Sequence, residues 1–236
     1  GFNIVTGLNP GGLADNLGTD LREHDARYER AEEFMQVCYS LWQSWDTDAL
    51  VRDPEKPLFA DPDKVHEIYF KGDHFSCRGP SQLPRSPQEI PVTFQAGQSP
   101  RGRQFAARHA EGVFTISPDL PAMQAYYRDV KDRVANEGRR ESDLAILTGI
   151  FPIVGTSEAA AKEKYEQLID LATVEAGLAW ISGYACFNFA QVSLDTKLSE
   201  LDPNNFAGIQ SIFELTMASS AEAASLTPYL FAYPHV

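Results

Sequence analysis

The chain has 236 residues, of which 43% are hydrophobic and 22% are charged, as in folded globular proteins rather than disordered ones. Its net charge of −13, from 33 acidic and 20 basic residues, argues against a general nucleic-acid binder. No apolar run approaches the ~18 residues of a membrane-spanning helix, so we expect no membrane association.

The first residues, 2–6, are apolar and already predict a core strand, although residue 1 is Gly rather than Met. This suggests that the sequence is a piece of a longer chain. A Gly-, Asn- and Asp-rich loop follows over 8–20, a common place for ligand contacts. A helix then begins near Glu23, and His24 and Tyr28 share one face of it because they lie four residues apart.

Seven prolines between residues 54 and 91 predict an irregular excursion over about 46–91 rather than a linker between domains. Within it, 66–70 and 75–78 flank Gly72-Asp73 and predict a β-hairpin. The three cysteines, Cys38, Cys77 and Cys186, have no metal or disulfide spacing. No signal-peptide pattern opens the sequence. We therefore expect reduced thiols and a cytoplasmic location.

The stretch 91–116 predicts a strand, a tight loop, a short helix over 100–110 and a second strand. Ser99 is a good N-cap residue, and Pro100 suits the first helical position. A helix N-terminus offers free N–H groups and the positive end of a dipole, which suits a phosphate. The plainer alternative is an ordinary turn whose serine only caps the helix.

Further helices are predicted over about 121–137, 157–175 and 206–225, whereas 181–195 is aromatic and resembles a loop. A long apolar strand is predicted over 144–154, with a bulge or an end at Pro152. Strands near 2–6, 92–96, 113–116 and 145–153 should be parallel and adjacent in that order, because single helices connect them.

Four such strands are half of an eight-stranded α/β barrel. Polar residues follow three of them at their carboxyl ends, in Thr6-Gly7, in Gly97–Ser99 and in Thr115–Ser117. Barrel enzymes build their sites at that edge of the sheet.

The segments GFNIVTG, REHDARYERAEEF, CYSLWQSW and GPSQLPRSPQEIPVTFQAGQSPRG resemble the bacterial luciferase-like flavin monooxygenases. The resemblance covers nearly the whole chain and is closest to the branch that oxidises nitrilotriacetate, EDTA and dibenzothiophene sulfone. It implies one α/β domain over 1–236, a partial (β/α)₈ TIM barrel with strands four to seven and the Pro-rich insertion, which lacks the first three strands and the last.

The resemblance also implies the cofactor and its ligands. His24 and Tyr28 match a pair that contacts FMN, Ser99 matches the serine that binds the FMN phosphate, and Thr6 lies where the strand-four end approaches the flavin. It assigns no catalytic side chain and no metal. The implied reaction uses reduced FMN and O₂ to oxygenate a small organic substrate. A separate NADH:FMN reductase supplies the flavin, and the complete protein forms a homo-oligomer.

Two alternatives stay open. The chain could be a truncated, catalytically inactive half-barrel with an assembly role or none, and its open sheet would then expose strand edges and apolar faces. It could also be a related barrel with a deazaflavin cofactor, although His24, Tyr28 and the QAGQS loop weigh against that.

Overall fold

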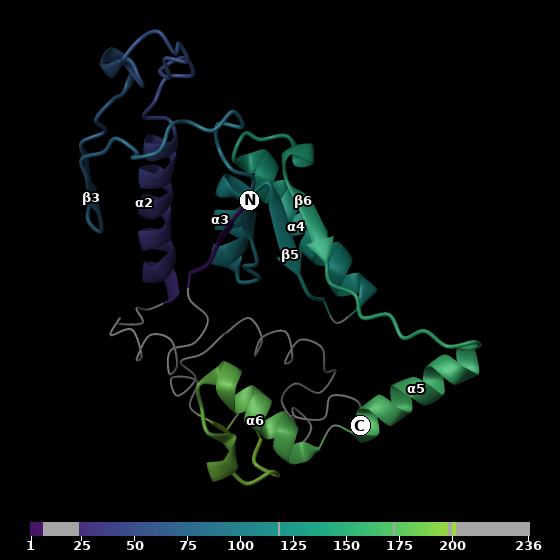
Figure 1. The fold of residues 1–236 in the computed structure, drawn as a ribbon. Helices are drawn as coiled ribbons and strands as arrows, with labels where there is room; N and C mark the ends of the chain where they lie inside the picture. Colours follow the sequence, from purple (N-terminus) through teal and green to yellow (C-terminus); the bar gives the residue numbers. More distant parts are fainter. Residues whose placement is uncertain (7–23, 118, 172, 198–199, 202–236) are drawn as a thin grey trace. The chain divides into compact units, whose positions relative to one another are not determined.

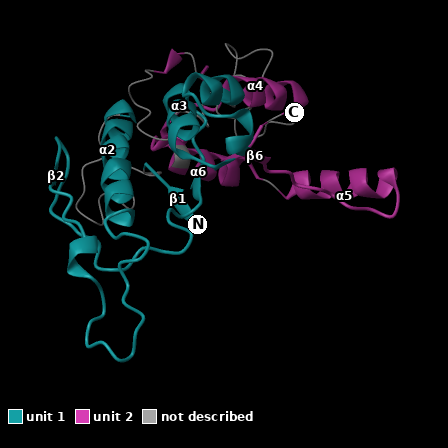
Figure 2. Cartoon of the chain, turned by 90° about the horizontal axis from the view of Figure 1, so that it is seen from above, with its two compact units in different colours: residues 1–6, 22–113, 130–145 teal, residues 7–21, 114–129, 146–236 magenta. Residues whose placement is uncertain are grey.

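The computed structural model describes residues 1–6, 24–117, 119–171, 173–197 and 200–201 (Figure 1). The expected loop over 8–20 and the expected helix over 206–225 lie outside these ranges. The chain divides into two compact units, coloured separately in Figure 2. Unit 1 consists of 1–6, 22–113 and 130–145, and unit 2 takes the remainder. The organisation as one domain stays a prediction.

The main sheet has the strand order β1-β4-β5-β6. Its strands are β1 (Phe2–Ile4), β4 (Thr93–Gln95), β5 (Gly112–Thr115) and β6 (Ala145–Thr148). β4 pairs in parallel with both β1 and β5. Along β6, the amides of residues 145 and 149 donate to the carbonyls of residues 111 and 115, a spacing that also makes β5 and β6 parallel. The predicted order and direction of the four strands are therefore confirmed.

The two faces of this sheet differ in exposure. On β5, Val113 and Thr115 are buried, whereas Phe114 and Ile116, which alternate with them, are 47% and 55% exposed. Side chains along a strand point alternately to opposite faces, so Phe114 and Ile116 lie on the same face. That face is apolar and open to solvent, and the opposite face belongs to the core.

The strand predicted over 144–154 is shorter than expected, because β6 ends at Thr148. A Cβ on Gly149 would lie 2.9 Å from the ring of Phe114. Beyond Gly149, Ile150 and Phe151 are 80% and 83% exposed. Pro152 has no backbone N–H that could continue the hydrogen bonds of the sheet. The apolar run therefore leaves the sheet instead of prolonging it.

The helices are α2 (His24–Trp42), α3 (Pro100–His109), α4 (Leu120–Asn136), α5 (Glu158–Asp170) and α6 (Val174–Ala185). Short 3₁₀ turns occupy Pro62–Lys64, Glu141–Asp143 and Phe189–Gln191. The prediction of a loop over 181–195 was wrong for its first residues, because α6 extends to Ala185. Thr173 caps this helix by accepting a hydrogen bond from the amide of Ala176. No helix among the described residues is long and apolar enough to cross a membrane.

Helix α2 contributes an apolar stripe to the core of unit 1. Tyr28, Ala31 and Met35 are buried with Ile4 and Phe105, and Trp42 packs against this cluster. The helix therefore covers β1 and α3, and this packing places its first residues beside the turn after β4.

The Pro-rich insertion carries the predicted hairpin, in which β2 (Phe70–Lys71) pairs antiparallel with β3 (Ser76–Cys77). The strands are shorter than predicted. The hairpin turn is held to α2 by one carboxylate, since Glu33 accepts hydrogen bonds from the amides of Asp73, His74 and Phe75. The guanidinium of Arg30, also on α2, lies 4.7 Å from the centre of the Phe75 ring.

We expect Glu33→Ala to release the hairpin turn from α2, because three amides lose their common acceptor. Hydrogen exchange of residues 70–77 should accelerate by roughly tenfold or more, with little change in the remainder of unit 1. Glu29→Ala, at an exposed position of the same helix, is the control. Unchanged exchange in Glu33→Ala would contradict this anchoring role.

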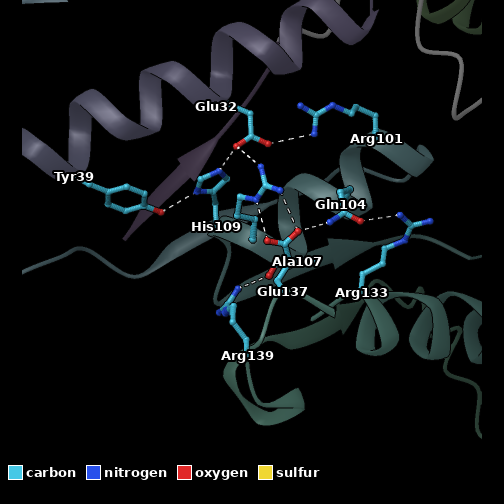
Figure 3. Close-up of polar contacts among 10 residues, drawn as sticks. Glu32, Tyr39, Arg101, Gln104, Ala107, His109, Arg133, Glu137 and Arg139 are labelled. Carbon is cyan, nitrogen blue, oxygen red and sulfur yellow. Dashed lines mark hydrogen bonds and ion pairs between the residues drawn. The ribbon is translucent and has the colours of Figure 1, made fainter. Parts of the chain in front are cut away.

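An ionic network joins α2, α3 and the end of α4 (Figure 3). Glu32 of α2 accepts from His109 Nε2 at 2.6 Å and from Arg101 and Arg108 at 3.2 Å each. Arg108 also donates to Glu137, at the end of α4, at 3.0 Å. One carboxylate on α2 thus binds both ends of α3.

The charges of this network set the ionisation of Glu32. Burial alone would raise the pKa of Glu32, but the hydrogen bond and charge of His109, the charge of Arg108 and the hydrogen bond of Arg101 lower it to about 2. A hydrogen bond from Arg108 likewise lowers the pKa of Glu137. Both carboxylates therefore stay ionised at neutral pH.

We expect Glu32→Gln to reduce the free energy of unfolding by roughly 2–3 kcal/mol at pH 7, between the values for surface and buried pairs. The pKa of Glu32 falls from 4.5 to about 2 on folding, so its stabilisation is complete above pH 4.5 and is lost as the pH falls through 2. The difference between the wild type and Glu32→Gln in urea unfolding should shrink across that interval.

Glu67→Gln is the control, because Glu67 pairs with the exposed Arg78 in the insertion and has no contact with the network. It should leave the midpoint of unfolding unchanged within error. A difference between the wild type and Glu32→Gln that stayed constant from pH 7 to about pH 2 would show that the ionised carboxylate does not provide the stabilisation.

Candidate functional site

The turn between β4 and α3 brings two glycines into backbone contact. A Cβ on Gly97 would lie 2.8 Å from the Cα of Gly102, and one on Gly102 would lie 2.9 Å from the Cα of Gly97. Both distances are shorter than real Cβ contacts, so neither position accepts a side chain without movement. In the structure the missing Cβ of Gly97 makes room for α3.

Ser99 caps α3 as the sequence predicts. Its backbone is extended, with φ −63° and ψ 156°, and its hydroxyl accepts from the amide of Gly102 at 3.1 Å. Pro100 occupies the first helical position. Ser99 is only 7% exposed, so its hydroxyl lies within the turn rather than on the surface.

The same hydroxyl contacts α2, which sequence reasoning did not foresee. His24 Nε2 lies 3.1 Å from Ser99 Oγ, and His24 Nδ1 lies 2.8 Å from a carboxylate oxygen of Asp25. The first residue of α2 therefore meets the first turn of α3 at the carboxyl end of β4. This is the edge of the sheet at which barrel enzymes build their sites.

Tyr28 lies one helical turn further along α2 and is 4% exposed. Its ring contacts that of His24, with centroids 5.2 Å apart, and a Cβ on Gly102 would lie 2.6 Å from its hydroxyl oxygen. The guanidinium of Arg101 lies 5.6 Å from the centre of the Tyr28 ring. Tyr28, His24 and Ser99 thus form one group around the start of α3.

Two arginines near this turn, Arg101 and Arg103, are both engaged. Arg101 pairs with Glu32, and its side chain is 27% exposed. Arg103 Nε donates to the carbonyl of Gln98 at 2.7 Å. The positive charge near the turn is therefore partly neutralised and held in place by the chain itself.

The remaining candidates lie elsewhere along the same edge of the sheet. Thr6 follows β1 by two residues and is partly buried. Thr115 is 1% exposed and its hydroxyl has no hydrogen-bond partner in the described part of the chain, but it shares the buried face of β5 with Val113. The structure therefore groups His24, Tyr28 and Ser99 and does not join the two threonines to them.

Three further residues support the group through contacts that we did not predict. Asp25 contacts His24, Gly102 makes room for Tyr28, and Glu32 holds Arg101. The signal for Glu32 was present in the sequence, because it lies four residues after Tyr28 and eight after His24, hence on the same face of α2. Only folding showed which partners it meets.

We expect Gly102→Ala to destabilise the protein by about 1–3 kcal/mol, because the new methyl group would displace Tyr28 or Gly97. Gly183→Ala in α6 is the matched control. A Cβ there meets nothing within 4 Å, so it should stabilise its helix by about 0.5–1 kcal/mol. Thermal unfolding of both variants checks this, and equal midpoints would show that the glycine contact is not tight.

The luciferase-like monooxygenase family matches residues 2–222. The chain is 45% identical over 201 residues to dibenzothiophene-sulfone monooxygenase of Rhodococcus erythropolis, which covers 85% of the chain and 44% of that protein. It is 42% identical over 183 residues to nitrilotriacetate monooxygenase component A of Aminobacter aminovorans, which covers 77% of the chain and 40% of that protein.

Among solved structures, a riboflavin lyase with modified FMN and its substrate riboflavin superposes with a TM-score of 0.84 at 29% identity, covering 98% of this chain and 51% of that one. The chain thus spans about half the length of the relatives that it matches. The matches confirm the resemblance drawn from the sequence, including its dibenzothiophene-sulfone and nitrilotriacetate branch. The chain belongs to the luciferase-like monooxygenase family.

Proposed function

We propose that this chain is part of a flavin-dependent monooxygenase that uses reduced FMN and O₂ to insert one oxygen atom into a small organic substrate. The observation that carries the proposal is the junction of His24, Tyr28 and Ser99 at the start of α3, in a chain of this family. The riboflavin lyase structure with its modified FMN supports a flavin in this fold.

The residues at the junction fit the phosphate of FMN. A phosphate needs hydrogen-bond donors, and the junction offers the Ser99 hydroxyl, beside the ring of His24, and the first-turn amide of Arg101, which has no acceptor within α3. The amide of Gly102 in the same turn is not available, because it already donates to Ser99. The donor set is therefore smaller than the sequence suggested.

In this proposal, the chain holds and orients the cofactor. Ser99 and the amide of Arg101 bind the phosphate, and Tyr28 and Arg101 form the wall beside it. Thr6, at the end of β1, approaches the flavin from the neighbouring strand. Bound reduced FMN supplies the electrons for the activation of O₂, so the protein itself needs no nucleophile.

The fold and the partners follow from the same proposal. The four parallel strands would be strands four to seven of a (β/α)₈ barrel, and the exposed side chains of Phe114 and Ile116 would then lie inside the complete barrel. The name of the nitrilotriacetate relative, component A, supports a two-component system in which a separate NADH:FMN reductase supplies reduced FMN. We also propose that the complete protein is a cytoplasmic homo-oligomer.

Replacing Ser99 tests the phosphate site. In the complete protein, Ser99→Ala should weaken FMN binding by roughly tenfold to a hundredfold, because charge-assisted hydrogen bonds contribute about 1.5–3 kcal/mol. Binding of riboflavin, which lacks the phosphate, should be nearly unchanged. Anaerobic titration with each reduced flavin measures both affinities.

Two further variants separate phosphate binding from helix capping. Ser157→Ala removes the same kind of cap from α5 and should leave FMN binding unchanged. Ser99→Asp keeps an N-cap acceptor but adds negative charge, so it should weaken FMN binding more than Ser99→Ala does. Equal losses for FMN and riboflavin in Ser99→Ala would mean that Ser99 only caps α3.

Activity distinguishes the proposal from its alternatives. The complete protein, supplied with FMN, NADH and a flavin reductase, should show O₂ uptake that depends on an organic substrate. A truncated, inactive half-barrel would bind no FMN. Breakdown of riboflavin without an added organic substrate would instead indicate a reaction like that of the riboflavin lyase.

A further inference from the structure

Two short contacts fix where the ring protons of His24 can lie. His24 Nδ1 is 2.8 Å from a carboxylate oxygen of Asp25, and a carboxylate only accepts hydrogen bonds, so Nδ1 carries a proton. In the neutral ring, Nε2 is then an acceptor. Nε2 is 3.1 Å from Ser99 Oγ, so neutral His24 accepts the hydrogen bond that Ser99 can donate.

This arrangement leaves Ser99 unable to donate to an anion. The hydroxyl has one proton and two lone pairs, and one lone pair already accepts from the amide of Gly102 at 3.1 Å. When the proton points to His24, only a lone pair remains to face a ligand, and it repels phosphate oxygens. A second proton on His24 reverses the contact, because Nε2–H then donates to Ser99 and frees its O–H.

We infer that binding of the FMN phosphate takes up one proton at His24, and that Asp25 is the positioning residue that holds the resulting imidazolium. The inference rests on the proposed phosphate site at Ser99. It assigns His24 a role as the group that sets the direction of the Ser99 hydrogen bond. Flavin affinity is therefore coupled to pH.

Charged and polar groups face the His24 ring from both helices that pack against it. From α2, Asp25 attracts it at 2.8 Å, and Tyr28 contacts the ring with centroids 5.2 Å apart. From α3, Arg101 opposes the proton, but its charge is paired with Glu32 at 3.2 Å. A bound phosphate adds negative charge beside Ser99, which favours an imidazolium further.

Proton uptake can be counted directly in the complete protein. Calorimetric titration with oxidised FMN, repeated at pH 7.5 in buffers of different ionisation enthalpy, should show an uptake approaching one proton per FMN. Affinity for FMN should fall as the pH rises, by up to ~10-fold per pH unit. Riboflavin should bind without uptake, because it has no phosphate for Ser99.

Two variants separate proton uptake at His24 from proton exchange by the phosphate, which itself titrates near pH 6. His24→Gln retains the proton exchange of the phosphate and should lose the additional uptake. Asp25→Asn keeps the imidazole but lowers the charge beside it, so FMN affinity should fall at pH 7.5 and stay near that of the wild type at pH 5.5. If His24→Gln folds poorly, Asp25→Asn still tests the inference.

The outcomes separate this inference from the proposed function. FMN binding with the same proton uptake in the wild type, His24→Gln and Asp25→Asn would overturn the inference and leave the flavin site standing. If the complete protein bound no FMN, the proposed function and the inference would both be wrong. Uptake that is lost in His24→Gln and seen with FMN but not with riboflavin would support the inference.

Discussion

The contact between Gly97 and Gly102 is the constraint on which the junction depends. Because neither residue has a Cβ, the chain can turn from β4 into α3 at van der Waals distance. This turn places Ser99 as the cap of α3, inside the protein rather than on its surface. Any side chain at Gly102 would also meet the hydroxyl of Tyr28, so the turn and α2 are fixed together.

The charged residues around α3 both hold this helix against α2 and position a group of the candidate site. Glu32 binds Arg101 at the first turn of α3 and His109 at its last, so one carboxylate orients the whole helix against α2. The same contacts keep Arg101 over the ring of Tyr28 instead of in solvent. The site therefore has a positive group whose position is fixed and whose charge is largely balanced, which limits how strongly it alone attracts an anion.

These features agree with the chemistry of the family. A flavin enzyme needs its cofactor held firmly, since the cofactor performs the redox reaction and the protein supplies binding and orientation. The junction of α2, α3 and the β4 turn offers a capped helix N-terminus, a buried hydroxyl and an imidazole within 3.1 Å of it. In the function that we propose, this group holds the phosphate of the cofactor, and substrate choice belongs to other parts of the protein.

The sequence by itself determined the α/β class, the four parallel strands and their order, because apolar periodicity and single-helix crossovers depend only on local pattern. It also determined Ser99 as a cap, since capping involves residues three apart. Only the tertiary structure decided that the apolar run after Thr148 leaves the sheet, since pairing partners are distant in sequence. For the same reason, only folding could join Ser99 to His24 and Arg101 to Glu32, which lie 75 and 69 residues apart.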